Sequence, residues 1–547
     1  MRRTNFNNQF FYPISLSVLY FLGNFMLMQN AHFHEDAYIL FVYVENLVDN
    51  GVITYFPSGM PTEGVTDFLW MILVSALCVT GIDVGTSVIL LNTIGVFIIS
   101  LIVYQEAQKI TVNHFLVKFL KFFLPLIWII QHFFTASIGG FSVNLYMALI
   151  LLAYMSLLNN KYLRFAPYLG LTVALFRPDG VILGVGFALI GSYISYKQNE
   201  LKKYVVSIAI SVFIGLIYFG WRYYYFGNLL PLPLYVKSSV DGLPGIGSNL
   251  GWIKQHIFII GIVLFLSFYL KLAKKYFVLA LPSIILFIML LTAEQTQNIG
   301  FRFQAPMFIV LYFTLVIFLK ELINRTNNSA FAKTTIILLS GWLLILGAKS
   351  LNNSYQHFST FSYINEFPQV LNKRLQDRKR DNIAIALTEA GRIAYWNQSN
   401  NTKIYDLVGL NSEYSAMNTI DLNYINLLSP DVLMYHQASE LKIDDFVNMS
   451  SRVLDLNASQ LESKNNYKNR EAISKVSNAS VAATKFLQKY GDAYNIMLVD
   501  YDEDKSFSHV YAFKKNLNIS DTIKEDLLKI FKKQNIISYY EMRNTDK

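Results

Sequence analysis

Two adjacent carboxylates follow the first long apolar run of this chain and are its clearest candidates for chemistry. The segment reads His32-Phe33-His34-Glu35-Asp36. Acidic side chains at the water edge of a membrane helix are costly to desolvate, so their presence there suggests chemistry at a membrane surface. The plainer alternative is a solvated acidic loop. A divalent metal could also bind this run, but histidines in polar loops are usually not ligands, so we expect no metal and no other cofactor.

Basic side chains in the polar connectors are candidates for binding a phosphate. A leaving phosphate gains negative charge, which fixed cations stabilise. Alternatives stay open, because an arginine at a helix end can anchor the interface or belong to an aromatic belt. Anchoring at the interface is the alternative for Arg177, which precedes a proline. A position in an aromatic belt is the alternative for Arg222, which follows a tryptophan. The candidate cations are Arg177, Arg222, Lys237 and Arg302.

The composition of the chain indicates a membrane protein with a soluble part. The chain has 547 residues, of which 53% are hydrophobic, and its mean hydropathy is +0.35. Apolar runs of membrane-span length fill residues 1–349, whereas residues 350–547 have the composition of a soluble α/β domain. The net charge of +9 comes from basic residues in short connectors, so we expect no nucleic-acid partner. The single cysteine, Cys78, excludes an intrachain disulfide.

The distribution of lysine and arginine predicts the membrane topology. Basic connectors stay in the cytoplasm, which places residues 31–67 and everything after 349 on the opposite side. The apolar run 68–82 is short for a span, and we predict a surface helix there, with the next span over 87–105. The first apolar run, near 13–29, reads as a span and not as a cleaved signal. We therefore predict a polytopic α-helical protein with about eleven transmembrane helices.

The C-terminal part reads as an α/β domain. Apolar stretches rich in β-branched residues predict strands at 382–387, 432–436, 496–500 and 510–513, and the last two should form a hairpin. Helices are expected at 480–490 and 520–533. The region lacks a nucleophile elbow, a P-loop and a metal motif, so we interpret it as an acceptor-binding or structural domain.

Several short segments, in this order along the chain, resemble the GT-C superfamily of membrane glycosyltransferases. The resemblance is to the arabinofuranosyltransferase-like branch. The segments are Glu35–Ile39, Glu63–Trp70, Phe176–Gly180, Tyr225–Pro231 with Tyr235 and Lys237, Arg302–Pro306, and the paired strand motifs Ala390–Tyr395 and Asp406–Asn411. Three positions depart from the family pattern, namely the acid-free segment Gly139–Asn144, Leu232-Pro233 in place of Asn-Thr, and Asp67 in place of Asn.

The resemblance implies a polyprenyl-phosphate sugar as donor and a glycan, lipopolysaccharide or pilin-type protein as acceptor. Asp36 matches the family's catalytic acid, and Glu35 is the runner-up. Transfer needs a base for the acceptor hydroxyl and a carboxylate beside an oxocarbenium-like ring. The matching segments also make Tyr38 and Glu63 candidates for substrate binding. The expected location is a bacterial inner membrane, with the C-terminal domain extracytoplasmic.

Two other function classes remain open at this point. A flippase for a lipid-linked glycan would place charges inside its helix bundle and show internal repeats, whereas the charges here gather in connectors on one side. A membrane scaffold that recruits envelope proteins through its C-terminal domain would leave the acid pair without a role. The sequence leaves the sugar, the acceptor and the stereochemical outcome undefined, and arabinofuranose is one candidate sugar.

Overall fold

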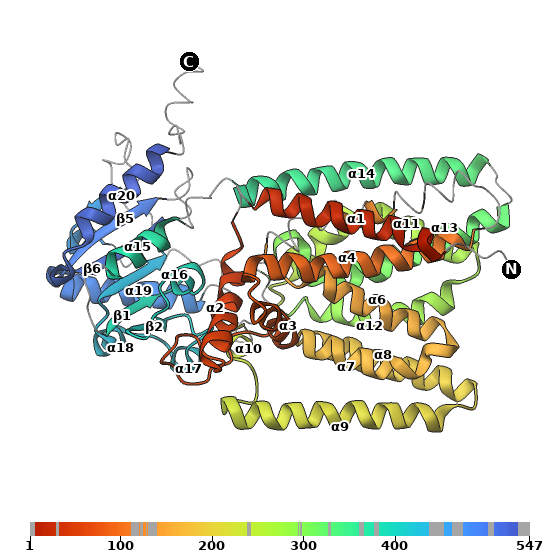
Figure 1. Ribbon diagram of the computed structural model, residues 1–547, viewed down its shortest axis with the longest axis horizontal. Coiled ribbons are helices and arrows are strands. Elements are labelled where there is room, and N and C mark those ends of the chain that lie inside the picture. The colour runs from red at the N-terminus through yellow and green to blue at the C-terminus, as the bar shows by residue number, and fades with distance from the viewer. Residues whose placement is uncertain are drawn as a thin grey trace, which may run out of the picture. The chain divides into compact units, whose positions relative to one another are not determined.

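A computed structural model describes most of the chain and is shown in Figure 1. The described residues are 6–28, 32–110, 120, 124–126, 128–129, 139–237, 242–293, 295, 298–326, 330–359, 366–376, 382–436, 453–461, 474–500 and 508–533.

The chain divides into two compact units, each made of several segments. The first unit contains Met1–Ala31, Thr66–Tyr224 and Gly242–Ser359. The second contains His32–Val65, Tyr225–Asp241 and Thr360–Lys547. The acid pair and its loop therefore group with the C-terminal domain and not with the apolar helices.

The first unit consists of helices. Their bounds are α1 Phe6–Leu27, α3 Phe68–Cys78, α4 Val84–Gln108, α6 Val143–Leu158, η2 Asn160–Phe165, α7 Ala166–Phe176, α8 Gly180–Lys197, α9 Leu201–Phe226, α11 Ile246–Tyr269, α12 Ala273–Met289, η3 Ile299–Gln304, α13 Ala305–Thr326 and α14 Ala330–Ser359. Helix α9 runs two residues past the end of the unit at Tyr224.

Within the described residues, 6 helices are long and apolar enough to cross a membrane. They are Phe10–Leu27, Val84–Gln108, Gly180–Lys197, Leu201–Phe226, Ile246–Tyr269 and Ile299–Arg325. This finding agrees with a helical membrane protein. The total of about eleven spans stays a prediction. At residues 68–82 the structure has the 11-residue helix α3, which is too short to span, and α4 covers the expected span at 87–105.

Small and polar side chains hold neighbouring helices of this unit together. A Cβ atom on Gly95 of α4 would lie 2.5 Å from the backbone of Asn144 in α6, so the two helices are in direct backbone contact. The Asn92 side chain accepts from the Asn144 amide at 3.0 Å and donates to the Phe141 carbonyl at 2.9 Å. Asn144 in turn donates to the Tyr20 hydroxyl at 2.8 Å. Interhelical hydrogen bonds of this kind fix helix pairs where lipid supplies no hydrophobic driving force.

The second unit is built on a six-stranded mixed sheet with the order β2-β1-β3-β6-β5-β4. The strands are β1 Ile383–Leu387, β2 Thr402–Asp406, β3 Val432–His436, β4 Val453–Leu456, β5 Tyr494–Asp500 and β6 Ser508–Lys514. Strands β1, β2 and β3 run parallel, whereas β6 is antiparallel to β3 and β5 is antiparallel to both β6 and β4.

Helices flank this sheet, and one of them, α2, begins with the acid pair Glu35 and Asp36. They are α2 Glu35–Asn50, α10 Leu232–Lys237, α15 Glu366–Gln376, α16 Arg392–Trp396, α17 Glu413–Met417, α18 Leu422–Leu428, η6 Ala458–Gln460, α19 Ser474–Tyr490, η8 Gly491–Ala493, η9 Lys515–Leu517 and α20 Ser520–Lys533. Helix α2 packs against α16, and a buried apolar core between α19 and one face of the sheet includes Leu433, Phe486 and Leu498.

The strand predictions at β1, β3, β5 and β6 are confirmed, as are the β5–β6 pairing and the helices α19 and α20. The strand reading of Ala390–Tyr395 is wrong, because this segment is the loop after β1 followed by helix α16. The segment at Asp406 begins as the last residue of β2 and continues as a turn.

Candidate functional site

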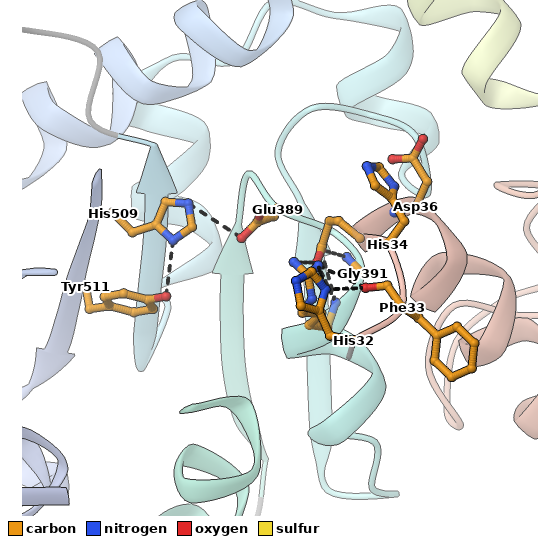
Figure 2. A network of polar contacts seen from close by, with 10 residues as sticks. His32, Phe33, His34, Asp36, Glu389, Gly391, His509 and Tyr511 are labelled. Carbon is orange, nitrogen blue, oxygen red and sulfur yellow. Dashed lines mark hydrogen bonds and ion pairs between the residues drawn. The ribbon is translucent and has the colours of Figure 1, made fainter. Parts of the chain in front are cut away.

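Glu35, the first residue of α2, is held by the start of α16. Its carboxylate accepts hydrogen bonds from the backbone amides of Gly391 and Arg392, the latter at 3.0 Å. The Arg392 guanidinium donates to it at 2.9 Å and also donates to the Phe33 carbonyl at 3.1 Å. The nitrogen that donates to Phe33, Nη2, also lies 3.2 Å from Nδ1 of His32. Figure 2 shows this network around Gly391. An anion at a helix N-terminus is favourable, so the network gives Glu35 a structural role.

Glycine is required at position 391 by this close approach. A Cβ atom there would lie 2.1 Å from the Glu35 carbonyl oxygen and 2.6 Å from its Oε1. No side chain fits at such distances without a shift of α2 against α16. The Ala390-Gly391-Arg392 run therefore positions the acid pair through its backbone.

The ionisation of Glu35 is set by opposing influences. Burial raises the pKa of its carboxyl, and the neighbouring Glu389 carboxylate raises that pKa further. The guanidinium of Arg392 and the two backbone amides act in the other direction, because they bind the charged form. Arg392 thus lowers the pKa of two buried acids, Glu35 and Glu389.

Asp36 is placed differently from Glu35, although the two are adjacent. Consecutive side chains on a helix diverge by about 100°, and Asp36 is half-buried. Its backbone amide donates to Nδ1 of His34 at 3.1 Å, which makes His34 the N-cap of α2. His32 and His34 therefore serve the ion-pair network and the helix cap.

The carboxyl ends of the parallel strands bring further polar side chains to the same region of the second unit. Glu389 follows β1, His436 ends β3, and His509 lies on β6 opposite His436. The carboxylate of Glu389 lies 3.5 Å from Nε2 of His509. Open parallel sheets bind ligands at the carboxyl ends of their strands, which is the reason this edge is a candidate site.

Burial dominates the ionisation of this second cluster. It raises the pKa of Glu389 to about 7, and Asp36 raises it as well, while Arg392 lowers it. Burial lowers the pKa of His436 to about 4 and that of His509 well below its ordinary value. Sequence reasoning missed these three residues, although a polar residue directly after a strand is the signal that could have found Glu389.

The second unit also contains Tyr38, Glu63 and Lys237, which were predicted to bind substrate. Tyr38 is buried, with its ring centroid 5.2 Å from that of Tyr395 and 5.7 Å from the Arg392 guanidinium. Glu63 is also buried, and its carbonyl accepts from the Leu232 amide at 3.1 Å, which joins the loop after α2 to α10. Lys237 is the last residue of α10 and is half-buried.

Two of the predicted cations meet in the first unit. The guanidinium carbons of Arg177 and Arg302 lie 5.5 Å and 5.0 Å from the centroid of the Phe303 ring. Arg302 also lies over the Phe141 ring at 3.7 Å. Arg177 forms an ion pair with Asp179 at 3.0 Å. Arg177 and Arg302 are only 9% and 8% exposed, so two buried arginines lie around one aromatic ring near the ends of apolar helices.

Acidic and hydroxyl groups complete this arginine cluster. Asp179 accepts from the Tyr146 hydroxyl at 3.4 Å, and Arg177 lies 5.3 Å from the Tyr146 ring. Asp67 accepts from the Ser142 hydroxyl at 2.9 Å. Ser142 is the N-cap of α6, the helix that contains Tyr146. Arg222 lies elsewhere, in α9, where it is buried and its guanidinium lies 5.9 Å from the Phe219 ring.

The first unit also contains a cavity of about 550 Å³ that sequence reasoning did not find. Its walls come from α11, η3, α13 and α14 and combine aromatic side chains with lysines. They include Trp252, Phe301, Trp342, Lys254 and Lys349. Phe301 directly precedes Arg302 in η3, so one short helix contributes to both the cavity and the arginine cluster.

Comparisons with known proteins give a match for part of the chain. Residues 354–496 match a family described as a domain of unknown function, DUF8728. No protein with a curated description matches the chain. The matched residues include Glu389, Arg392 and His436, and the description of the family supplies no activity.

Proposed function

We propose that this protein is a membrane glycosyltransferase that uses a polyprenyl-phosphate sugar. It transfers the sugar to a glycan or protein acceptor on the extracytoplasmic face of a bacterial inner membrane. The resemblance to the GT-C superfamily supports this assignment, as do the apolar helices of membrane length. In this proposal Arg177 and Arg302 recognise the donor phosphate, and Asp36 accepts the proton of the acceptor hydroxyl.

The observation that carries the proposal is the meeting of Arg177 and Arg302 on the Phe303 ring. These arginines come from segments far apart in the sequence, and both were candidates for phosphate binding. Guanidinium groups bind phosphate through two parallel hydrogen bonds. A buried ionisable group near a membrane is expensive and marks a functional site by default. The arginine pair therefore fits a leaving group that carries one phosphate.

The cavity in the first unit offers a place for the lipid part of the donor. Its aromatic walls suit an isoprenoid chain, and Lys254 and Lys349 supply positive charge. Ligand sites of this size are mostly apolar with a few polar groups. We assign the cavity to lipid binding within this proposal.

Replacing Arg302 by Ala is expected to slow transfer by roughly thirty- to a hundred-and-fifty-fold. This corresponds to about 2–3 kcal/mol, the contribution of one charge-assisted hydrogen bond in a transition state. We expect Lys237→Ala to weaken donor use as well. The measurement is the initial rate of sugar transfer with varied donor.

Arg164 provides a matched control for Arg302. Its guanidinium also lies 5.0 Å from an aromatic ring, that of Phe165, but the side chain is exposed. Arg164→Ala should leave the rate unchanged. Unchanged donor kinetics for Arg302→Ala would remove this arginine from the phosphate site.

The predicted topology gives opposite results for two reporter fusions. A reporter after Ser359, at the end of α14, should report the non-cytoplasmic side, and one in the turn at Leu270–Leu272 should report the cytoplasm. The reason is the asymmetry of lysine and arginine among the connectors. Alkaline phosphatase and green fluorescent protein fusions provide the readout. A cytoplasmic signal after Ser359 would place the acid pair on the wrong side for this chemistry.

Donor turnover in vesicles tests the proposal as a whole. Purified protein is reconstituted with a polyprenyl-phosphate sugar, and the released polyprenyl phosphate is measured. A glycosyltransferase breaks the bond between sugar and phosphate. A flippase would move the donor across the bilayer with that bond intact, and this result would replace the proposal.

A further inference from the structure

Three side chains with metal-binding atoms meet at the carboxyl edge of the sheet in the second unit. Glu389 lies in the loop after β1, His436 ends β3 and His509 lies near the start of β6. The ligand atoms of these residues all lie within 4.8 Å of one another. His436 and His509 are directly paired across the β3–β6 ladder, and their rings are 4.8 Å apart. Figure 2 shows His509 and Glu389 pointing toward each other.

Both imidazoles are oriented by hydroxyl groups through the same ring nitrogen. Nδ1 of His436 lies 3.0 Å from the Thr388 hydroxyl, and Nδ1 of His509 lies 3.4 Å from the Tyr511 hydroxyl. Histidines that bind a metal through Nε2 use Nδ1–H in this way, donating it to an oxygen that fixes the ring. These contacts make Nε2 the ligand atom that each ring would offer to a metal.

The spacing of the ligand atoms is close to that around a metal ion. Ligands of a tetrahedral ion at 2.0–2.2 Å lie about 3.4 Å apart. Nε2 of His509 and Oε2 of Glu389 are already 3.5 Å apart. The third ligand atom, that of His436, lies within 4.8 Å of the other two, so a side-chain rotation at the end of β3 that shortens these separations by at most about 1.4 Å completes the tetrahedral spacing.

We infer that Glu389, His436 and His509 form a binding site for one divalent transition-metal ion, best fitted by Zn²⁺. Two imidazoles and one carboxylate are a ligand set of zinc sites that keep a fourth position open for water or a bound oxygen. Mg²⁺ and Ca²⁺ prefer oxygen ligands and fit poorly. The inference is independent of the proposed glycosyltransferase activity.

Metal content and affinity of the full-length protein in detergent test this site. The protein is stripped with a chelator, exposed to Zn²⁺ and separated from free ion, and its zinc is then measured by mass spectrometry. We expect one Zn²⁺ per chain, undiminished by excess Mg²⁺. Glu389→Gln, His436→Gln and His509→Gln should each weaken binding at least about a hundred-fold.

Two control variants separate this site from other acids and histidines. Glu413→Gln removes an exposed acid of α17 in the same unit. His34→Asn keeps a side-chain oxygen to cap α2 and tests the alternative site at the His32–Asp36 run. Both variants should bind Zn²⁺ as the wild type does. Loss of binding in His34→Asn, or wild-type affinity in all three ligand variants, would overturn the inference.

A measurement on the wild type alone covers the case in which a ligand variant fails to fold. Bound Zn²⁺ joins β1, β3 and β6, so backbone hydrogen exchange in these strands should slow when the ion is added to stripped protein. Wild-type protein that retains no Zn²⁺ and shows no change in exchange would contradict the site directly.

Discussion

Replacing Asp36 by Asn is expected to reduce sugar transfer by about a hundred- to ten-thousand-fold, the usual contribution of a general base. Asparagine has nearly the same size and keeps one acceptor oxygen, but it cannot take a proton or carry charge. Because the backbone amide of Asp36, and not its side chain, makes the capping contact with His34, the helix start should be preserved. The measurement is the single-turnover rate with saturating donor, alongside a folding check by circular dichroism.

Two further variants of α2 sharpen this prediction. Asp49→Asn, at the exposed end of the same helix, is the matched control and should have the wild-type rate. Glu35→Gln should affect transfer less than Asp36→Asn does, because Glu35 is engaged with Arg392. A dead Glu35→Gln variant combined with an active Asp36→Asn variant would exchange the two roles. Full activity in both would remove the acid pair from catalysis.

Replacing Arg392 by Ala is expected to destabilise the second unit by about 3–5 kcal/mol, the cost of breaking a buried ion pair. The Arg392 and Glu35 side chains are only 7% and 15% exposed, so the remaining carboxylate would lose its partner away from water. Hydrogen exchange in the full-length protein measures the effect, and the protection of α2 and α16 should fall most.

The ion pair between Arg374 and Asp526 is the control for this effect. The Arg374 side chain is 29% exposed, so Arg374→Ala should cost about 1 kcal/mol or less. Combining Arg392→Ala with Glu35→Gln should recover part of the lost stability, because no unpaired charge then stays buried. Equal costs for Arg392→Ala and Arg374→Ala would show that the Glu35 network does not hold α2 to α16.

Local pattern was sufficient to predict much of this fold. Long apolar runs predicted helices because such a run can be buried only as a helix in lipid. Strands β1, β3, β5 and β6 were found from their β-branched and apolar residues. Strand β2 was missed because Lys403 and Asp406 interrupt its apolar pattern, and β4 because it has only 4 residues. The order of the sheet depends on pairing between distant segments, which no local window contains.

The candidate sites, like the order of the sheet, depend on residues that are far apart in the sequence. The acid pair was recognisable in the sequence as two adjacent acidic residues. Arg392, the partner of Glu35, lies 357 positions later and was not. The sequence placed the loop of the acid pair with the membrane helices, whereas its contacts belong to the C-terminal unit. Glu389, His436 and His509 were missed because they occupy three separate segments that only the sheet register brings together.

In the proposed reaction the sugar leaves its lipid carrier while the phosphate stays on the polyprenol. A donor with one label on the sugar and another on the phosphate tests this directly, with the full-length protein in vesicles and acceptor present. We predict that the sugar label moves to the acceptor and that the phosphate label remains with the polyprenol, at a rate that Asp36→Asn lowers by about a hundred- to ten-thousand-fold. Departure of both labels together, or retention of both on the lipid, would contradict it.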